Sequence, residues 1–352
     1  MSLVNRRAFL GMAGIAGLAL MGGCSGGSSA SQSGEQKSQE SADASQASQG
    51  ASQASGESAA GISLTVGTLA TEDILPLWVA AAEGLNETQG LNVDIVTFQS
   101  ATELISGISS GEVDLAMTDI MVTASIFASG TDVQMQWVTL GAEPSQGRFG
   151  IMAGPKSEIN GLSDLAGVPI GVGSNTILEY VMDKLLEGAG VAESDILVEE
   201  LQKLPVRYQA MASGEVAAAA LPGTLLALGE ANGCKLIADD TQGENLSQSV
   251  MIVRAELLSD ANYTQAIETL EDVWDEAAGL INANPEAYRT VLVENANLPE
   301  EIAETYPISA YPTVQLPTSA MVDPVLEWME HKGYLTKALA YDEATGTFSV
   351  KS

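Results

Sequence analysis

Two copies of a short motif constrain the fold of this chain more than any other feature. Ser110–Asp119 reads Ser-Gly-Glu-Val-Asp-Leu-Ala-Met-Thr-Asp, and Ser213–Pro222 reads Ser-Gly-Glu-Val-Ala-Ala-Ala-Ala-Leu-Pro. In each copy the Ser-Gly pair can end a helix, and the apolar run after it is typical of a buried parallel strand. The residues that follow begin a loop at the carboxyl end of that strand, where open α/β sheets bind ligands. The two copies therefore predict a two-lobed protein that binds something between its lobes.

The residues before each copy repeat the same order of elements. Before the first copy we expect a strand at 62–67, a helix at 76–83 ended by Gly84, a strand at 91–98 and a helix at 101–109. Before the second copy we expect a strand at 168–173, a helix capped by residues 174–176, a strand at 196–201 and a helix at 205–212. Each half is thus βαβαβ, which predicts an α/β fold in which each lobe is a mostly parallel sheet flanked by helices.

Two crossings between the lobes are expected. Residues 133–140 and 148–152 are strand-like and flank the first crossing, and residues 249–253 are a candidate return crossing. Amphipathic helices are expected at 260–281, from 284, from 299 and at 323–332, packed on the first lobe. The expected division is residues 61–146 with 250–352 in lobe 1, and residues 147–249 in lobe 2.

The first 60 residues are not expected to belong to the fold. Residues 1–24 contain Arg6-Arg7, an apolar run up to Met21 and Gly22-Gly23 before Cys24, which resembles a lipoprotein signal peptide with a twin-arginine-like motif. Cys24 is the expected lipidated residue; an uncleaved N-terminal anchor is the alternative. Residues 25–60 are rich in Ser, Gln, Gly and Ala, so we expect a disordered tether. Either way the protein is expected outside the cell membrane and attached to it.

The composition excludes several classes of function. The 352 residues carry a formal charge of −32 with only 14 Lys and Arg, which argues against nucleic-acid binding. His331 is the single histidine, and Cys234 is the single cysteine besides Cys24, so the sequence offers no metal-binding spacing and no internal disulfide if Cys24 is acylated. We expect neither a metal nor another cofactor.

With both repeats laid out, the chain resembles the solute-binding proteins of ABC importers. Within these it is similar to the group that binds nitrate, taurine, aliphatic sulfonates and the pyrimidine precursor of thiamine. The resemblance lies on residues 67–85, 100–118, 162–172, 210–222, 328–334 and Tyr341-Asp342. It implies the type II periplasmic-binding-protein-like fold, closure of two lobes over a small solute, and delivery to an ABC permease in the membrane. We expect the protein to act as a monomer.

The candidate site lies where helix N-termini follow strands, because these ends present unpaired N–H groups and a partial positive charge. Ser and Thr at such positions also serve as helix caps, so each residue alone has a structural explanation as well. Their convergence at strand ends favours a binding site. The candidate ligand-binding residues are Thr68, Glu72, Asp73, Ser100, Thr102, Thr118, Asp119, Ser174, Asn175, Thr176, Leu221, Pro222 and Gly223.

The charge of the solute is left open by the sequence. Arg148 and Arg207 are the cations expected near a lobe entrance, although an arginine at a helix start is more often a surface residue. Glu72, Asp73 and Asp119 favour a cationic or hydrogen-donating solute, although acidic residues early in a helix also stabilise its dipole. Trp78 is a candidate for stacking on a heterocycle, with core packing as the alternative.

Two other classes of function compete with solute capture. A pyrimidine-precursor synthase shares the resembled fold, but it relies on a histidine, a lysine-bound cofactor and a cysteine cluster. Here the single histidine, His331, lies between Glu330 and Lys332 near a helix end, as a surface residue does, so we expect no catalysis. A lipoprotein that senses a ligand for a signalling partner would carry the same binding module, and the sequence does not separate it from an importer component.

Overall fold

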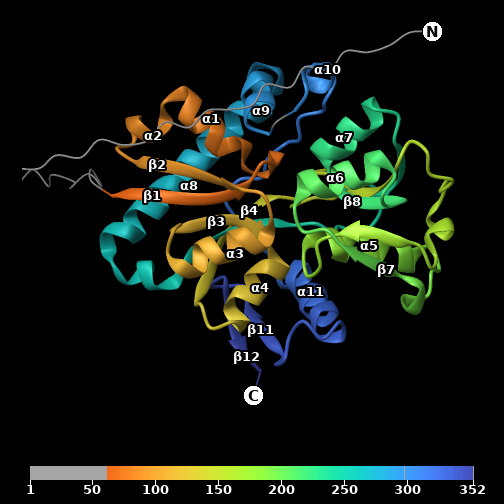
Figure 1. The fold of residues 1–352 in the computed structure, drawn as a ribbon. Coiled ribbons are helices and arrows are strands. Elements are labelled where there is room, and N and C mark those ends of the chain that lie inside the picture. Colours follow the sequence, from red (N-terminus) through yellow and green to blue (C-terminus); the bar gives the residue numbers. More distant parts are fainter. Residues whose placement is uncertain (1–61, 297, 352) are drawn as a thin grey trace, which may run out of the picture. The chain divides into compact units, whose positions relative to one another are not determined.

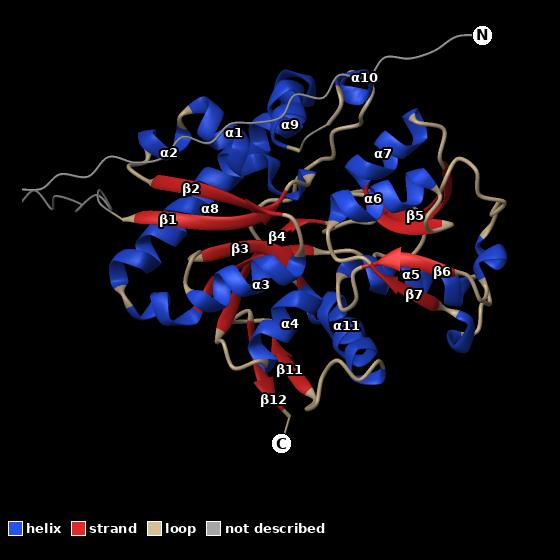
Figure 2. Ribbon diagram, in the orientation of Figure 1, coloured by secondary structure: helices blue, strands red, loops and turns tan. Residues whose placement is uncertain are grey.

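Two β-sheets organise the part of the chain that the structure describes. The computed structural model describes residues 62–296 and 298–351, so the expected signal segment, with Cys24, and the tether lie outside the described residues. Figures 1 and 2 show the two sheets with helices packed around each of them. The α/β fold class is therefore confirmed.

The first sheet has the order β11-β12-β4-β10-β3-β1-β2, and the second has the order β7-β6-β8-β5-β9. The strands of the first are β1 (Ser63–Leu69), β2 (Asn92–Phe98), β3 (Leu115–Asp119), β4 (Val133–Leu140), β10 (Ser249–Arg254), β11 (Leu339–Asp342) and β12 (Thr347–Val350). Those of the second are β5 (Phe149–Ala153), β6 (Pro169–Val172), β7 (Leu197–Glu200), β8 (Ala218–Pro222) and β9 (Lys235–Asp239). Strand β1 pairs in parallel with β2 and β3, and β6 pairs in parallel with β7 and β8. The predicted repeat is confirmed.

The motif copies have equivalent places in the two sheets. Helices α3 (Ala101–Ser110) and α6 (Leu204–Ser213) end at Gly111 and Gly214, whose φ angles of 79° and 87° suit glycine. The apolar runs that follow form β3 and β8, and every residue of both strands is buried. Ser100 caps α3 as predicted, because its hydroxyl accepts the N–H of Glu103 at 3.2 Å. Local sequence thus determines these turns.

The remaining helices include the predicted ones, with differences at particular ends, and the short α2, which was not predicted. They are α1 (Leu75–Glu83), α2 (Leu85–Thr88), α4 (Ile120–Ala128), α5 (Ile177–Gly188), α7 (Gly223–Ala231), α8 (Ala261–Ala283), α9 (Arg289–Asn295), α10 (Glu300–Ala303) and α11 (Ser319–His331). Helix α11 begins four residues before the predicted start at Asp323, with Pro324 inside it. The return crossing is residues 240–248, and the predicted crossing at 249–253 is β10, a central strand of the first sheet.

Alternate residues of β3 face two separate cores, which explains why the strand is apolar throughout. Leu115 and Met117 pack with α1 and α8, where Trp274 is fully buried. Ala116 belongs to the other core, with residues of α3, α4 and α11. Helices therefore cover both faces of the first sheet, as Figure 1 shows. Trp78 lies in the first of these cores and is 6% exposed. Its surroundings therefore fit core packing, the alternative to stacking on a solute.

The two crossings between the sheets touch each other. Residues 141–148 lead from β4 to β5, and the Asn245 amide of the return crossing donates to the carbonyls of Gly141 (2.9 Å) and Ala142 (3.3 Å). A Cβ atom at Gly141 would lie 1.8 Å from the Ser247 carbonyl oxygen, and its φ is 86°. Only glycine fits at this position.

Candidate functional site

A cavity opens where the parallel strands of both sheets end. It is lined by the last residues of β1, β3 and β8, by the segments that follow β2, β6 and β7, and by the first residues of β5 and β10. The lining residues are Leu69, Thr71, Asp73, Ser100, Ala101, Met117, Thr118, Asp119, Phe149, Thr176, Ile177, Leu178, Gln202, Leu204, Arg207, Pro222 and Ser249. This is the position at which open α/β sheets bind ligands.

Asp119 joins the two walls of the cavity. Its carboxylate accepts the Val122 N–H of α4 at 2.7 Å and the Ile177 N–H of α5 at 3.0 Å, so one side chain caps two helices. Burial raises the Asp119 pKa to about 6, against the opposing effect of these two N–H groups. Thr176 occupies the N-cap position of α5, within the predicted cap at residues 174–176, but its hydroxyl donates to the Gly173 carbonyl and makes no cap bond. The cap comes from the other sheet.

Arg207 supplies the buried cation of the cavity. It is 2% exposed and lines the cavity, so a surface position, the alternative for an arginine at a helix start, is wrong. Its guanidinium donates to three backbone carbonyls, of Leu201 (2.8 Å), Ala220 (3.1 Å) and Gln202 (3.2 Å). Burial lowers the Arg207 pKa to about 10, which leaves it charged at neutral pH. A guanidinium has five N–H donors, and these bonds use three of them.

Arg148, the other candidate cation, is engaged in ion pairs. Its guanidinium lies 2.7 Å from the Asp239 carboxylate and 3.1 Å from that of Glu230, both in the same half of the molecule. It lines a small neighbouring pocket and not the cavity itself. Arg148 is therefore less suited than Arg207 to pair with a solute.

A buried acid next to the cavity is held in its neutral form. Glu72 is 4% exposed, and burial together with the charge of Asp73 raises its pKa to about 8. The nearby Tyr306 hydroxyl opposes this rise in the Glu72 pKa. A Cβ atom at Gly223 would lie 2.7 Å from the Tyr306 hydroxyl and 3.0 Å from a Glu72 oxygen, so α7 can approach only because Gly223 lacks a side chain. Asp73 itself lines the cavity and accepts a hydrogen bond from Ser249.

The structure brings together some of the candidate residues and separates others. Those that line the cavity are Asp73, Ser100, Thr118, Asp119, Thr176 and Pro222. Those outside its lining are Thr68, Glu72, Thr102, Ser174, Asn175, Leu221 and Gly223. Thr68 and Leu221 are fully buried, and the hydroxyl of the exposed Thr102 donates to Gln202 at 3.3 Å. The ligand-binding role of the whole set stays a prediction.

Sequence reasoning omitted apolar lining residues and did not select Arg207 as a binding residue. Its position in the first turn of α6, two residues after Pro205, was the available signal, but burial at that position depends on the packing of β8. Phe149 and Ser249 also line the cavity, each as the first residue of a strand that follows a crossing. Their place in the cavity depends on where the chain crosses from one sheet to the other.

The groups that a catalytic reading would need lie away from the cavity. His331 is exposed and faces Glu193 at 3.0 Å. Cys234 is buried among apolar residues, and burial raises its thiol pKa, which disfavours the nucleophilic thiolate. Within residues 62–296 and 298–351, no group of three His, Cys, Asp or Glu is arranged to hold a metal ion. The helices in that part of the chain are all too short or too polar to cross a bilayer.

Comparison with known proteins gives the family. The family model described as "NMT1/THI5 like" matches residues 71–287, more than half of the chain. The chain belongs to the NMT1/THI5-like family. No curated protein matches the sequence. The family match begins within the first repeat and ends beyond the second, so it includes both walls of the cavity.

Solved structures show the same fold at low sequence identity. The alkanesulfonate-binding protein SsuA from Xanthomonas axonopodis pv. citri, bound to MOPS, is 20% identical with a TM-score of 0.65 over 78% of this chain and 95% of that one. The periplasmic aliphatic sulphonate binding protein SsuA from Escherichia coli is 17% identical with a TM-score of 0.65 over 78% and 94%. The desulfurization enzyme DSZB is 15% identical with a TM-score of 0.60 over 78% and 94%. The predicted periplasmic-binding-protein-like fold is confirmed, and it is a fold that binding proteins and an enzyme share.

Proposed function

We propose that the protein is an extracytoplasmic solute-binding lipoprotein of an ABC importer, and that it captures a small polar solute in the cavity between the two sheets. The observation that carries the proposal is the cavity at the strand ends, with a buried arginine on one wall and buried carboxylates on the other. In this proposal lobe 1 (61–146 and 250–352) and lobe 2 (147–249) close over the solute. A monomer anchored through Cys24 then delivers it to the permease.

The cavity supports a compact solute with a polar head. About 60 Å³ of space remains within it, whereas one buried water needs at least roughly 10–15 Å³. The other N–H donors of Arg207 would suit a sulfonate, nitrate or taurine-like anionic group, which an arginine can hold with paired hydrogen bonds. Asp73 and Asp119 suit a hydrogen-donating part, as in taurine or a pyrimidine precursor. We therefore keep the solute class expected from the sequence, which is a sulfonate, nitrate, taurine or a pyrimidine precursor of thiamine.

Calorimetry on the full-length protein tests the proposal with taurine, MOPS, nitrate and a hydroxymethylpyrimidine. We expect at least one to bind, and we expect Arg207→Lys to weaken binding of an anionic solute because lysine lacks the planar fork. Arg289→Lys is the matched control, since Arg289 also donates to backbone carbonyls, those of Ala303 and Tyr306, but lies outside the cavity lining. Equal affinities of the two variants would exclude Arg207 from the site, and absence of binding by the whole panel would contradict the proposed solute class.

The membrane anchor is tested separately. We expect Cys24→Ser to release the protein from the membrane fraction, because the proposed lipid would have no thiol to attach to. The variant should bind the same solutes with unchanged affinity. Retention of Cys24→Ser in the membrane would favour the uncleaved anchor instead.

A further inference from the structure

The turn between β6 and α5 forms part of the cavity wall and depends on an uncommon backbone conformation. Asn175 has a φ of 59°, and no other non-glycine residue in the described ranges has a positive φ. Its side-chain amide donates to the Ser125 hydroxyl of α4, and its backbone N–H donates to the Glu179 carboxylate, both at 2.6 Å. The next residue, Thr176, lines the cavity. The shape of this wall therefore depends on where the Glu179 carboxylate is held.

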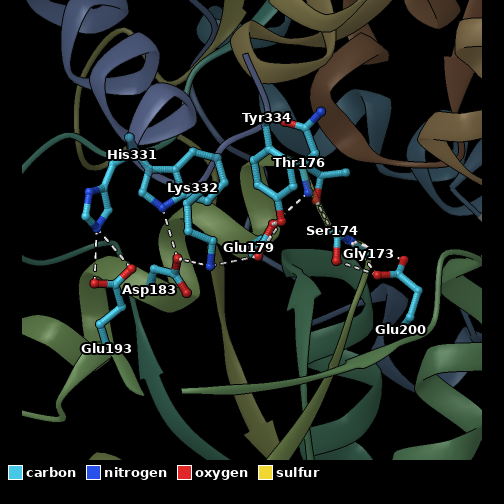
Figure 3. Close-up of polar contacts among 12 residues, drawn as sticks. Gly173, Ser174, Thr176, Glu179, Asp183, Glu193, Glu200, His331, Lys332 and Tyr334 are labelled. Atoms are coloured by element: carbon cyan, nitrogen blue, oxygen red, sulfur yellow. Dashed lines mark hydrogen bonds and ion pairs between the residues drawn. The ribbon is translucent and has the colours of Figure 1, made fainter. Parts of the chain in front are cut away.

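Two residues that follow α11 hold this carboxylate. Glu179 is 1% exposed, and its oxygens accept the Tyr334 hydroxyl at 2.7 and 2.9 Å, while the Lys332 ammonium lies 3.1 Å away. Figure 3 shows Tyr334 and Lys332 converging on Glu179, with Ser174 and Thr176 of the turn beside Tyr334. Burial of a carboxylate to this extent is costly unless such donors surround it. Neither Lys332 nor Tyr334 lines the cavity.

Lys332 also holds a second buried acid on the same helix. Its ammonium donates to Asp183 at 2.9 Å, and the Trp328 indole N–H donates to the same oxygen at 2.9 Å. Burial opposes the charge of Lys332, but Asp183 and Glu179 outweigh this effect and raise the Lys332 pKa. One lysine directly after α11 thus holds two carboxylates of α5, and its removal would leave both short of a donor.

We propose that Lys332 and Tyr334 are positioning residues of the solute site, which act through Glu179 to hold the 174–176 turn in its solute-facing conformation. The proposal rests on the proposed function, since it assigns these residues to the binding machinery of the cavity. It extends that machinery to the C-terminal region, beyond the residues that match the family model.

Amide hydrogen exchange of the solute-free, full-length protein tests the positioning directly. We expect exchange at the Asn175 amide to accelerate roughly tenfold or more in Tyr334→Phe and in Lys332→Met, because the acceptor of that N–H loses a donor. Lys332→Arg, which keeps the charge, should restore slow exchange. His331→Ala is the matched control on the same helix end, since His331 contacts only the exposed Glu193 in the hydrogen-bond network around it, and its exchange should match the wild type.

A general loss of structure would give a different pattern. It would accelerate exchange along the whole of α5, whereas loss of positioning is confined to the 174–177 segment. Unchanged exchange at Asn175 in both Tyr334→Phe and Lys332→Met, or acceleration spread evenly over α5, would overturn the proposal.

Titration with taurine and MOPS separates this proposal from the proposed function. Where the wild type binds either compound, Tyr334→Phe and Lys332→Met should bind it roughly tenfold more weakly, and Lys332→Arg and His331→Ala should not. Wild-type binding with equal affinity in all four variants would overturn the positioning role and leave the proposed function standing. Binding of neither compound would count against the sulfonate class, and the exchange experiment would still decide the positioning role.

Discussion

The ends of β3 and β8 follow copies of one motif, yet they build opposite walls of the cavity. Strand β3 ends in Asp119, whose carboxylate reaches the helix N-termini of both sheets. Strand β8 ends in Pro222, which offers no charge, and the cation of that wall comes from Arg207 in the preceding helix. The difference teaches that the repeated motif determines the backbone of each wall, whereas single residues around it determine the charge.

The largest effect that we expect is a fall in stability with rising pH, from Asp119 of the first wall and from Glu72 next to the cavity. The folded-state pKa of Glu72 is about 8 against 4.5 for the free group, and that of Asp119 is about 6 against 3.8. On these two groups the folded protein keeps protons that the unfolded chain releases, so their contribution to stability is complete below about pH 4 and is lost as pH rises to about 8. Between pH 5 and 8, Glu72 alone should lower the free energy of unfolding by on the order of 3 kcal/mol.

Urea denaturation at several pH values measures this fall. Glu72→Gln should remove most of the slope above pH 7, beyond the raised pKa values of Asp119 (about 6) and Glu271 (about 7). If the free energy of unfolding falls with pH as steeply in Glu72→Gln as in the wild type, Glu72 is ionised in the folded protein. It would then contribute nothing to the difference between the two walls.

Removal of the cation from the second wall should have the next largest effect. Arg207→Met leaves the carbonyls of Leu201, Gln202 and Ala220 without their donor, so we expect a loss of about 2–3 kcal/mol in the free energy of unfolding. Thermal and urea denaturation provide the measurement. A loss of less than about 0.5 kcal/mol in the free energy of unfolding would show that water replaces the guanidinium as donor to these carbonyls. Water would then reach this wall despite the burial of Arg207.

The carboxylate of the first wall should contribute less to stability. Asp119→Ala removes the acceptor of the Val122 and Ile177 N–H groups, and we expect a loss of about 1–2 kcal/mol, as for a helix cap. Asp119→Asn, which keeps an acceptor, should lose less. If the alanine and asparagine variants are equally stable in urea, the two caps do not contribute, and the β3 wall is held by its apolar packing alone.

The smallest expected effect is at the uncharged end of β8. Pro222 precedes α7 without a side-chain cap bond, so Pro222→Ala should lower the free energy of unfolding by about 0.5–1 kcal/mol, mainly through greater freedom of the unfolded chain. A comparison of thermal denaturation midpoints with those of Asp119→Ala measures the asymmetry of the walls. Equal or larger destabilisation by Pro222→Ala would contradict that asymmetry.

Local sequence was sufficient for the backbone of the site but not for its contacts. Gly111, Gly214 and Ser100 were predicted in their roles because each acts within one turn of its own helix. The Asp119 bond to Ile177 spans 58 residues and two sheets, so no local pattern contains it. Leu221 was predicted at the site from its place in the motif, but adjacent residues of a strand face opposite sides, and it packs in a core while Pro222 lines the cavity.

The two crossings have a mechanical consequence for the proposed closure. Asn245 bonds the return crossing to Gly141 and Ala142, and Gly141 leaves no room for a side chain beside Ser247, so in the proposed closure the two connections would bend together as one hinge. Paired connections resist sliding and twisting of one sheet past the other more than they resist bending. The walls of the cavity are thereby limited to an approach along one path, which would return Asp119 to the α5 N-terminus at each closure.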